Sequence, residues 1–115
     1  MSKLMAFSAP ILPGKTEQWK KFINELKTTR NKEFSESRKS LNIRERSFLQ
    51  QTPMGDVVVV TLEGDEPAAA FASIANSNNP FSEWFVKEVI EIHGFNLKDM
   101  MKMPQPELIL DSHTS

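Results

Sequence analysis

The segment Asp56–Glu63, with the sequence DVVVVTLE, is the strongest β-strand signal in this chain. Its β-branched side chains are restricted at χ1 and pack well on a pleated surface. Successive side chains of a strand point to opposite faces, so Val57 and Val59 face one way while Val58 and Val60 face the other. Both faces are apolar and both need cover. The helices of one small chain cover one face of a sheet, so the other face predicts contact with a second copy, in a homodimer.

A second strand is predicted directly before this one, over residues 42–51. The turn Thr52–Asp56 separates the two strands, and in it proline presets φ while glycine permits the left-handed conformation. This pattern is typical of an antiparallel hairpin. Alternation on the earlier strand places two sets of side chains on opposite faces: Ile43, Glu45, Ser47 and Leu49 on one, and Arg44, Arg46, Phe48 and Gln50 on the other.

The N-terminal part predicts another strand over residues 3–12 and a helix with an apolar stripe over residues 16–26. The polar and basic segment 27–39 is interpreted as a solvated helix face, or as a second helix after a break near residues 28–29. An alternative interpretation is a phosphate or carboxylate site that uses one of three basic side chains, Arg30, Arg38 or Lys39.

The C-terminal half predicts helices followed by one more strand. Residues 68–75 are rich in alanine, which gives a narrow helix that can lie close to a sheet. The segment Asn79–Gly94 predicts a helix that starts at a proline and stops at a glycine, and its wide apolar stripe indicates burial by several neighbours. Residues 98–106 are expected to form an irregular connection, residues 107–110 a short last strand, and residues 111–115 a flexible tail.

This order of strand, helix, two strands, helices and strand indicates an α+β chain with the split βαβ, or ferredoxin-like βαββαβ, arrangement around an antiparallel sheet. The length of 115 residues favours a single domain over residues 1–115. In this arrangement the helices cover one face of the sheet, and the other face carries the alternate valines of the central strand.

Composition excludes several classes of protein. The net charge of −1 gives no electrostatic reason to expect nucleic acid or an anionic membrane as a partner. Because the chain contains no cysteine, disulfides, thiolate metal sites and cysteine nucleophiles are ruled out. No apolar run approaches the ~20 residues that span a bilayer. The first residues lack the apolar stretch of a secretory signal, so we expect a cytoplasmic protein.

His93 and Glu45 are the candidate catalytic residues. Histidine titrates near neutral pH, and the C-terminus of a helix favours its protonated form. The alternative for His93 is a capping role in which it bonds the last carbonyls of its helix. Glu45 shares a face with apolar residues, where a carboxylate must be paired or bind a proton more readily than usual. It is either a general base beside a pocket or one member of a structural ion pair with a lysine or arginine across the sheet.

Aromatic and polar side chains supply the candidate substrate-binding residues. Phe81, Trp84 and Phe85 are interpreted either as an aromatic wall for a flat ligand or as ordinary core. Arg46 and Gln50 share the second face of their strand, where they either bind substrate or meet the dimer mate, with Glu63 or Asp65 as a carboxylate partner for arginine. Two histidines that are far apart give no metal-ligand spacing, so no metal site is predicted.

The chain resembles the dimeric α/β-barrel superfamily, which includes the antibiotic-biosynthesis monooxygenase-like families. The resemblance rests on Pro13-Gly14-Lys15 with Glu17 and Trp19, on the hairpin of residues 45–63, and on the late aromatic helix. More narrowly, four stretches are similar to a group of uncharacterised small bacterial proteins: Leu49–Asp56, Asn79-Pro80-Phe81 with Trp84-Phe85, Glu91–Gly94 and Pro106–Leu108.

The resemblance implies two sheets that pack into a barrel across a twofold axis, with a pocket in each protomer between sheet and helices. Relatives include cofactor-free oxygenases, isomerases, dehydratases, haem-degrading enzymes and proteins without known activity. The haem-degrading members use an asparagine on the first strand, where this chain has Phe7, Ser8 and Ala9, so neither haem nor another cofactor is expected. We therefore expect a small apolar or aromatic ligand and, in an enzyme, oxygenase or isomerase chemistry. The alternative is a non-catalytic ligand-binding or structural dimer.

Overall fold

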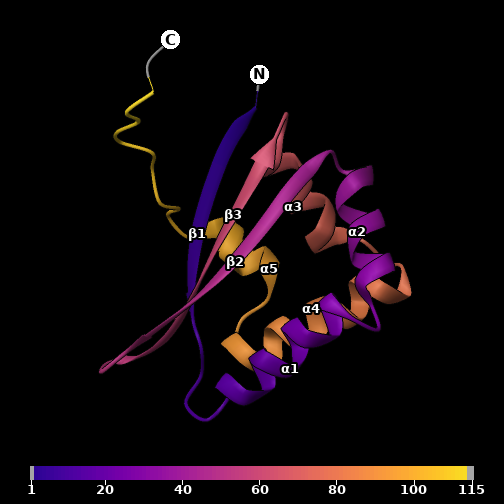
Figure 1. The fold of residues 1–115 in the computed structure, drawn as a ribbon, viewed down its shortest axis with the longest axis vertical. Coiled ribbons are helices and arrows are strands. Elements are labelled where there is room, and N and C mark those ends of the chain that lie inside the picture. Colours follow the sequence, from indigo (N-terminus) through magenta and orange to yellow (C-terminus); the bar gives the residue numbers. More distant parts are fainter. Residues whose placement is uncertain (1, 114–115) are drawn as a thin grey trace.

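Three strands form one antiparallel sheet in the computed structural model, which describes residues 2–113 (Figure 1). They are β1 (Lys3–Pro10), β2 (Ile43–Thr52) and β3 (Gly55–Gly64), in the order β1-β3-β2. The predicted hairpin is confirmed: β2 and β3 are joined at a turn in which Thr52 pairs with Gly55, and Gly55 has a positive φ of 128°. The valine strand β3 is therefore the central strand of the sheet.

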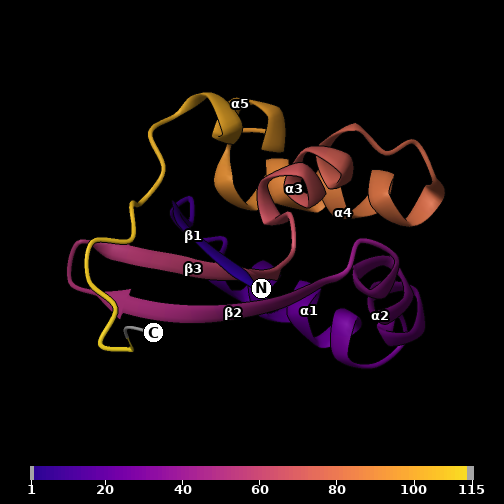
Figure 2. The same cartoon turned by 90° about the horizontal axis from the view of Figure 1, so that it is seen from above.

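Five helices pack over one face of this sheet (Figures 1 and 2). The break between the first two lies where the sequence predicts it, and the long aromatic helix starts and stops as expected. Asn79 caps that helix by accepting a hydrogen bond from the backbone N of Ser82 at 2.9 Å, and Gly94 ends it with a φ of 82°. The helices are α1 (Thr16–Lys27), α2 (Asn31–Ser40), α3 (Pro67–Asn76), α4 (Pro80–His93) and α5 (Leu97–Lys102).

The two faces of the sheet differ in cover. Val58, Val60 and Leu62 point toward the helices and are buried. On the opposite face, within residues 2–113, no helix lies over the sheet, and Phe48 remains 54% exposed. There Val59 lies between Ser8 of β1 and Phe48 of β2. We call this surface the open face.

The predicted irregular connection over residues 98–106 is wrong in its first part, because α5 occupies Leu97–Lys102. The side chain of Asn96 accepts a hydrogen bond from the backbone N of Asp99 at 2.8 Å and so caps the helix. Leu97 and Met100, three residues apart, are both buried against the core. A cap and a single apolar pair make a weak pattern in sequence, but burial of that pair stabilises the turn.

The predicted last strand over residues 107–110 does not form in the single chain, whose sheet contains three strands within residues 2–113. Pro104 and Pro106 pass beside Ser8 and Pro10 at the end of β1. The chain then runs away from the helices (Figure 2), and three apolar side chains are exposed there by 61%, 81% and 84%: Leu108, Ile109 and Leu110. Residues 114–115 of the predicted tail lie outside the described residues.

No helix within residues 2–113 is both long enough and apolar enough to cross a lipid bilayer.

Candidate functional site

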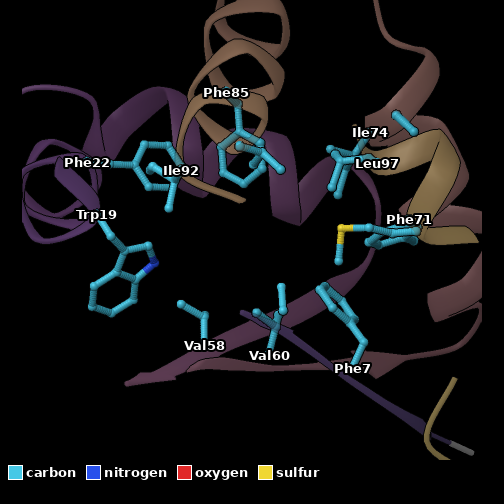
Figure 3. Close-up of a cluster of buried hydrophobic side chains, with 14 of the residues drawn as sticks. Phe7, Trp19, Phe22, Val58, Val60, Phe71, Ile74, Phe85, Ile92 and Leu97 are labelled. Atoms are coloured by element: carbon cyan, nitrogen blue, oxygen red, sulfur yellow. The ribbon is translucent and has the colours of Figure 1, made fainter. Parts of the chain in front are cut away.

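A largely apolar cavity lies between the sheet and the helices (Figure 3). Val58 and Val60 point from β3 toward Phe85 of α4, and Trp19 and Phe22 of α1 close one end. The cavity volume is about 60 Å³. One water molecule needs roughly 10–15 Å³ of such space, so the cavity has room for about four to six waters.

The cavity opens to solvent beside β2. Ser47 is exposed and also lines the cavity, so the wall is thinnest at this edge strand. Ile23 of α1 lines the same cavity and is half-buried. A small molecule would therefore enter between β2 and the first two helices.

Arg38 and Glu45 form a buried ion pair in the cavity wall. Arg38 lies in the last turn of α2, and its Nε donates to Oε1 of Glu45 on β2 at 2.7 Å. Their side chains are only 6% and 10% exposed. The prediction that Glu45 belongs to an ion pair is confirmed, although its partner comes from a helix. Because the guanidinium occupies this carboxylate, Glu45 is not a free general base in this arrangement.

Three further contacts define the position of the Arg38 guanidinium. Its Nη1 donates to Oγ of Ser37 at 2.9 Å, and its Cζ lies 4.8 Å from the ring centroid of Phe34 and 4.9 Å from that of Phe85. Such cation–π contacts favour a desolvated guanidinium. Its Nη2 is enclosed and lacks a hydrogen-bond partner among residues 2–113.

His93 lines the cavity from the end of α4 and is 8% exposed. Its Nδ1 lies 2.8 Å from the carbonyl oxygen of Pro10, an acceptor, so Nδ1 carries the proton and donates. No protein hydrogen bond to Nε2 is present within residues 2–113, which leaves this nitrogen as a proton acceptor. Burial lowers the pKa of His93 from 6.5, and the hydrogen bond to Pro10 opposes that shift only in part.

Two sequence interpretations of His93 need correction. The sequence predicts that the C-terminus of α4 favours the protonated form, but burial lowers the pKa of His93 below 6.5 and so favours the neutral imidazole at pH 7. The alternative capping role is not its function either. The backbone N of Gly94 caps the helix by donating to the carbonyl of Ile90 at 2.8 Å, and the His93 ring turns toward β1 instead.

The three aromatic candidates separate in the structure. Phe85 lines the cavity, whereas Phe81 and Trp84 do not. Phe81 is buried and packs against both of the others, with ring centroids 5.9 Å from Trp84 and 6.2 Å from Phe85. Trp84 is half-buried under the guanidinium of Arg30, whose Cζ lies 4.1 Å from the ring centroid. Phe81 is therefore part of the core, whereas Trp84 packs against the core on one side and under Arg30 on the other.

Arg46 and Gln50 lie on the open face of β2, away from the cavity. Arg46 pairs with Glu63 at 3.1 Å, as the sequence predicts, with side-chain exposures of 43% and 40%. His93, Glu45 and Phe85 therefore line the same cavity, and the other four candidates lie outside it. Within the cavity, His93 lies near Pro10, beside Val57 of β3, whereas Glu45 pairs with Leu62 five residues further along that strand.

The sequence interpretation did not place Arg38 in the cavity, although it named this residue as a candidate anion ligand. The cavity-lining Trp19 and Phe22 belong to a stripe that reads as plain core, and nothing in the sequence marks them otherwise. Among residues 2–113, no three histidine, aspartate or glutamate side chains lie close enough to share a metal ion. Comparison with protein-family models, with curated proteins and with solved structures finds no match to this chain.

Proposed function

We propose that the chain is a homodimeric α/β-barrel protein of ferredoxin-like topology that binds a small apolar or aromatic molecule in the cavity between its sheet and helices. The observation that carries this proposal is the apolar cavity with two polar groups in its wall, His93 and the Arg38–Glu45 pair. An apolar enclosure with a few placed polar groups is the common form of a small-molecule site.

In an enzyme of this kind, His93 would be the acid–base group. A neutral imidazole with a free Nε2 in a desolvated site accepts a proton from a bound substrate. A proton-transfer isomerisation, and an oxygenation that proceeds through a substrate carbanion, both begin with removal of a proton from carbon, so one base would serve either reaction. The proposed role of Glu45 is to hold Arg38 in position beside the substrate, and Phe85 would contact the substrate from the α4 side of the cavity.

Dimerisation is supported by the open face. Phe48 and Leu4 are 54% and 51% exposed there, and Val59 lies in the same surface. Packing of two such faces would bury these side chains and form the barrel. Because Phe48 is already about half buried, its full burial would contribute about half of the 1.5–3 kcal/mol of a fully exposed Phe, or roughly 0.8–1.6 kcal/mol per subunit. We propose that residues 107–110 then complete the βαββαβ order as a fourth strand, which would bury the exposed Leu108–Leu110 segment.

A ligand screen on a blocked variant tests the cavity. Ser47→Phe fills the opening beside β2, and Thr29→Phe places the same side chain on the exposed connection between α1 and α2. Small monocyclic aromatics should raise the thermal midpoint of the wild type and of Thr29→Phe, but not of Ser47→Phe. Equal stabilisation of all three proteins would contradict binding in this cavity.

Mass measurement tests the assembly. Light scattering after size exclusion should give about 26 kDa, twice the 13.1 kDa of one chain. Phe48→Glu places a charge in the proposed interface in both subunits, and should give 13 kDa at the same concentration. Met54, which is 98% exposed at the β2–β3 turn, provides the matched control, so Met54→Glu should remain dimeric. A monomeric wild type would refute the assembly.

The second candidate function is a non-catalytic ligand-binding dimer. The pairing of Glu45 with Arg38 favours it, because His93 is then the only predicted catalytic residue in the cavity wall that is not held in an ion pair. The two candidates differ in one measurement. Once a ligand is found, conversion that is lost in His93→Ala while ligand binding persists indicates an enzyme. Binding without conversion in the wild type indicates a carrier or sensor.

A further inference from the structure

A second, polar pocket lies between α2, α3 and the first turn of α4. Its volume is about 130 Å³, which is room for roughly nine to thirteen waters. No charged side chain lines it among residues 2–113, and the cap residue of α4, Asn79, contributes to its wall. Hydroxyl groups dominate the rest of the lining: Ser37 and Ser40 of α2, Ser73 of α3, Ser77 after α3, and Ser82 of α4. This composition favours an occupant with several hydrogen-bonding atoms.

Ser82 is the most deeply buried of these serines, at 4% exposed. Its backbone N donates to Asn79, but no hydrogen bond involves its Oγ within residues 2–113. Among those residues, the one fully enclosed side-chain nitrogen or oxygen without a partner belongs to Arg38, so Oγ of Ser82 is not fully enclosed. Because Ser82 lines the pocket, this hydroxyl is within reach of a molecule there. A buried hydroxyl without a partner costs free energy, and an occupant that binds it removes that cost.

Two further hydroxyls of the pocket have a proton left to donate. Oγ of Ser37 accepts a hydrogen bond from Nη1 of Arg38 at 2.9 Å, and Oγ of Ser77 accepts one from Nδ2 of Asn79 at 2.7 Å. No acceptor for either hydroxyl proton is present within residues 2–113. The guanidinium also polarises the Ser37 hydroxyl, which strengthens it as a donor. The pocket therefore presents hydroxyl donors from α2, from the connection after α3 and from α4.

The position of the pocket favours negative charge. Both Asn79 and Ser82 line it, so it lies at the N-terminus of α4, a helix of 14 residues. Aligned peptide dipoles give this end of a helix a partial positive charge, equivalent to roughly +0.5. Glu83, the acidic residue of the first turn, is exposed and does not line the pocket. Donor protons beside a helix N-terminus are complementary to an oxyanion.

We propose that this pocket binds the phosphate group of a small phosphate monoester. Three hydroxyl donors from separate elements match the tetrahedral oxygens of phosphate better than the two coplanar oxygens of a carboxylate. Ser40 and Ser73 are exposed, so the ester substituent would leave the pocket beside them. The site is separate from the cavity between sheet and helices, although Ile74 borders both, and it does not depend on the function proposed for that cavity.

Titrations of the ¹⁵N-labelled full chain test the proposal with four probes: methyl phosphate, inorganic phosphate, acetate and glycerol. Sodium chloride keeps the ionic strength constant. We expect methyl phosphate to shift the backbone amide resonances of Ser37, Ser77 and Ser82, and to bind at least tenfold tighter than acetate, the fold-change of one hydrogen bond to a charged group. Glycerol should cause no saturable shift.

Three outcomes would overturn the proposal. Acetate or glycerol that binds as tightly as methyl phosphate would show that the pocket does not select phosphate. Inorganic phosphate that binds while methyl phosphate does not would show that the pocket has no exit for an ester. If neither phosphate shifts the three serine resonances, the pocket is not an anion site, and binding in the cavity between sheet and helices is unaffected by that result.

Substitutions assign the binding to this pocket. Ser82→Ala should weaken methyl phosphate binding at least tenfold, while the helix cap persists because Asn79 accepts from the backbone N of Ser82. Ser35→Ala, at a half-buried position of α2 outside the pocket, should bind as the wild type does. Ser73→Asp places a carboxylate at the exposed rim and should abolish binding, whereas Thr29→Asp on the exposed connection should not. Unchanged affinity in Ser82→Ala would overturn the assignment.

Discussion

Removal of Glu45 alone should destabilise the protein strongly, because it leaves the Arg38 guanidinium buried without a carboxylate. The side chain of Arg38 is 6% exposed, and its Nε contacts Glu45 at 2.7 Å. Breaking a buried pair by removing one partner typically costs about 3–5 kcal/mol. Cation–π contacts with the rings of Phe34 and Phe85 stabilise the guanidinium by no more than about 2 kcal/mol. These contacts are already present in the native protein, so they do not compensate for the lost carboxylate. Glu45→Leu should therefore lose about 3 kcal/mol or more.

Urea unfolding measures this loss. With a slope of about 1–3 kcal/mol per molar urea for a small protein, a loss of 3–5 kcal/mol lowers the midpoint by about 2 M. The double variant Arg38→Met with Glu45→Leu replaces both charges by apolar groups, and should recover most of the lost stability. Glu17→Leu is the matched control, since Glu17 pairs with Lys20 at 3.6 Å while 87% exposed, and should lose less than about 1 kcal/mol.

The result that would refute this reasoning is a Glu45→Leu variant within about 1 kcal/mol of the wild type, since exposed pairs contribute no more than that. Such a result would mean that water reaches the guanidinium in the folded protein and solvates it after the carboxylate is removed. A double variant as unstable as Glu45→Leu would instead indicate that Arg38 and Glu45 do not act as a pair.

Three further perturbations probe other parts of the molecule. Because the folded-state pKa of His93 lies below its ordinary 6.5, the unfolded chain binds more protons, and the free energy of unfolding should fall as pH drops from 7 toward 5. His93→Gln should flatten that dependence in urea titrations, and a slope identical to that of the wild type would contradict a buried neutral imidazole. Ending the chain after Pro106 should weaken dimerisation in a dilution series, and unchanged dimer affinity would argue against a fourth strand. The same truncation should change the unfolding free energy of the monomer by less than about 0.5 kcal/mol, because residues 107–113 are exposed. Gly64→Ala should lower the free energy of unfolding by about 1–3 kcal/mol, since its Cβ would clash with the carbonyl oxygen of Asn42, and a neutral outcome would mean that the two strand ends separate readily.

Several elements of the fold follow from local sequence. The run of valines, the turn before it and the cap and stop signals of α4 act over a few residues, and the structure reproduces them. Backbone preferences and turn conformations depend on residues close together in the chain, so the sequence alone is enough to predict these elements. The separation of the valines into a buried set and a less buried set also follows, because alternation along a strand is fixed by backbone geometry.

The missed elements are those whose stability comes from burial. α5 forms because Leu97 and Met100 are buried in the core. A segment of only six residues is too short for its apolar spacing to predict that burial. Residues 107–110 have the apolar composition of a strand but lie apart from the sheet in the single chain, so their composition alone did not produce pairing.

The candidate site depended most on tertiary structure. Alternation along the strand and helical spacing are enough to place Glu45 on the same face as Ile43 and Leu49 and His93 at the end of an aromatic helix. Only the folded chain decided that Arg38 reaches Glu45, and that His93 bonds Pro10, 83 positions away in sequence. The reason is physical: the hydrogen-bond partner and the degree of desolvation of a buried polar group depend on the neighbours that packing brings to it, and those neighbours come from distant parts of the chain.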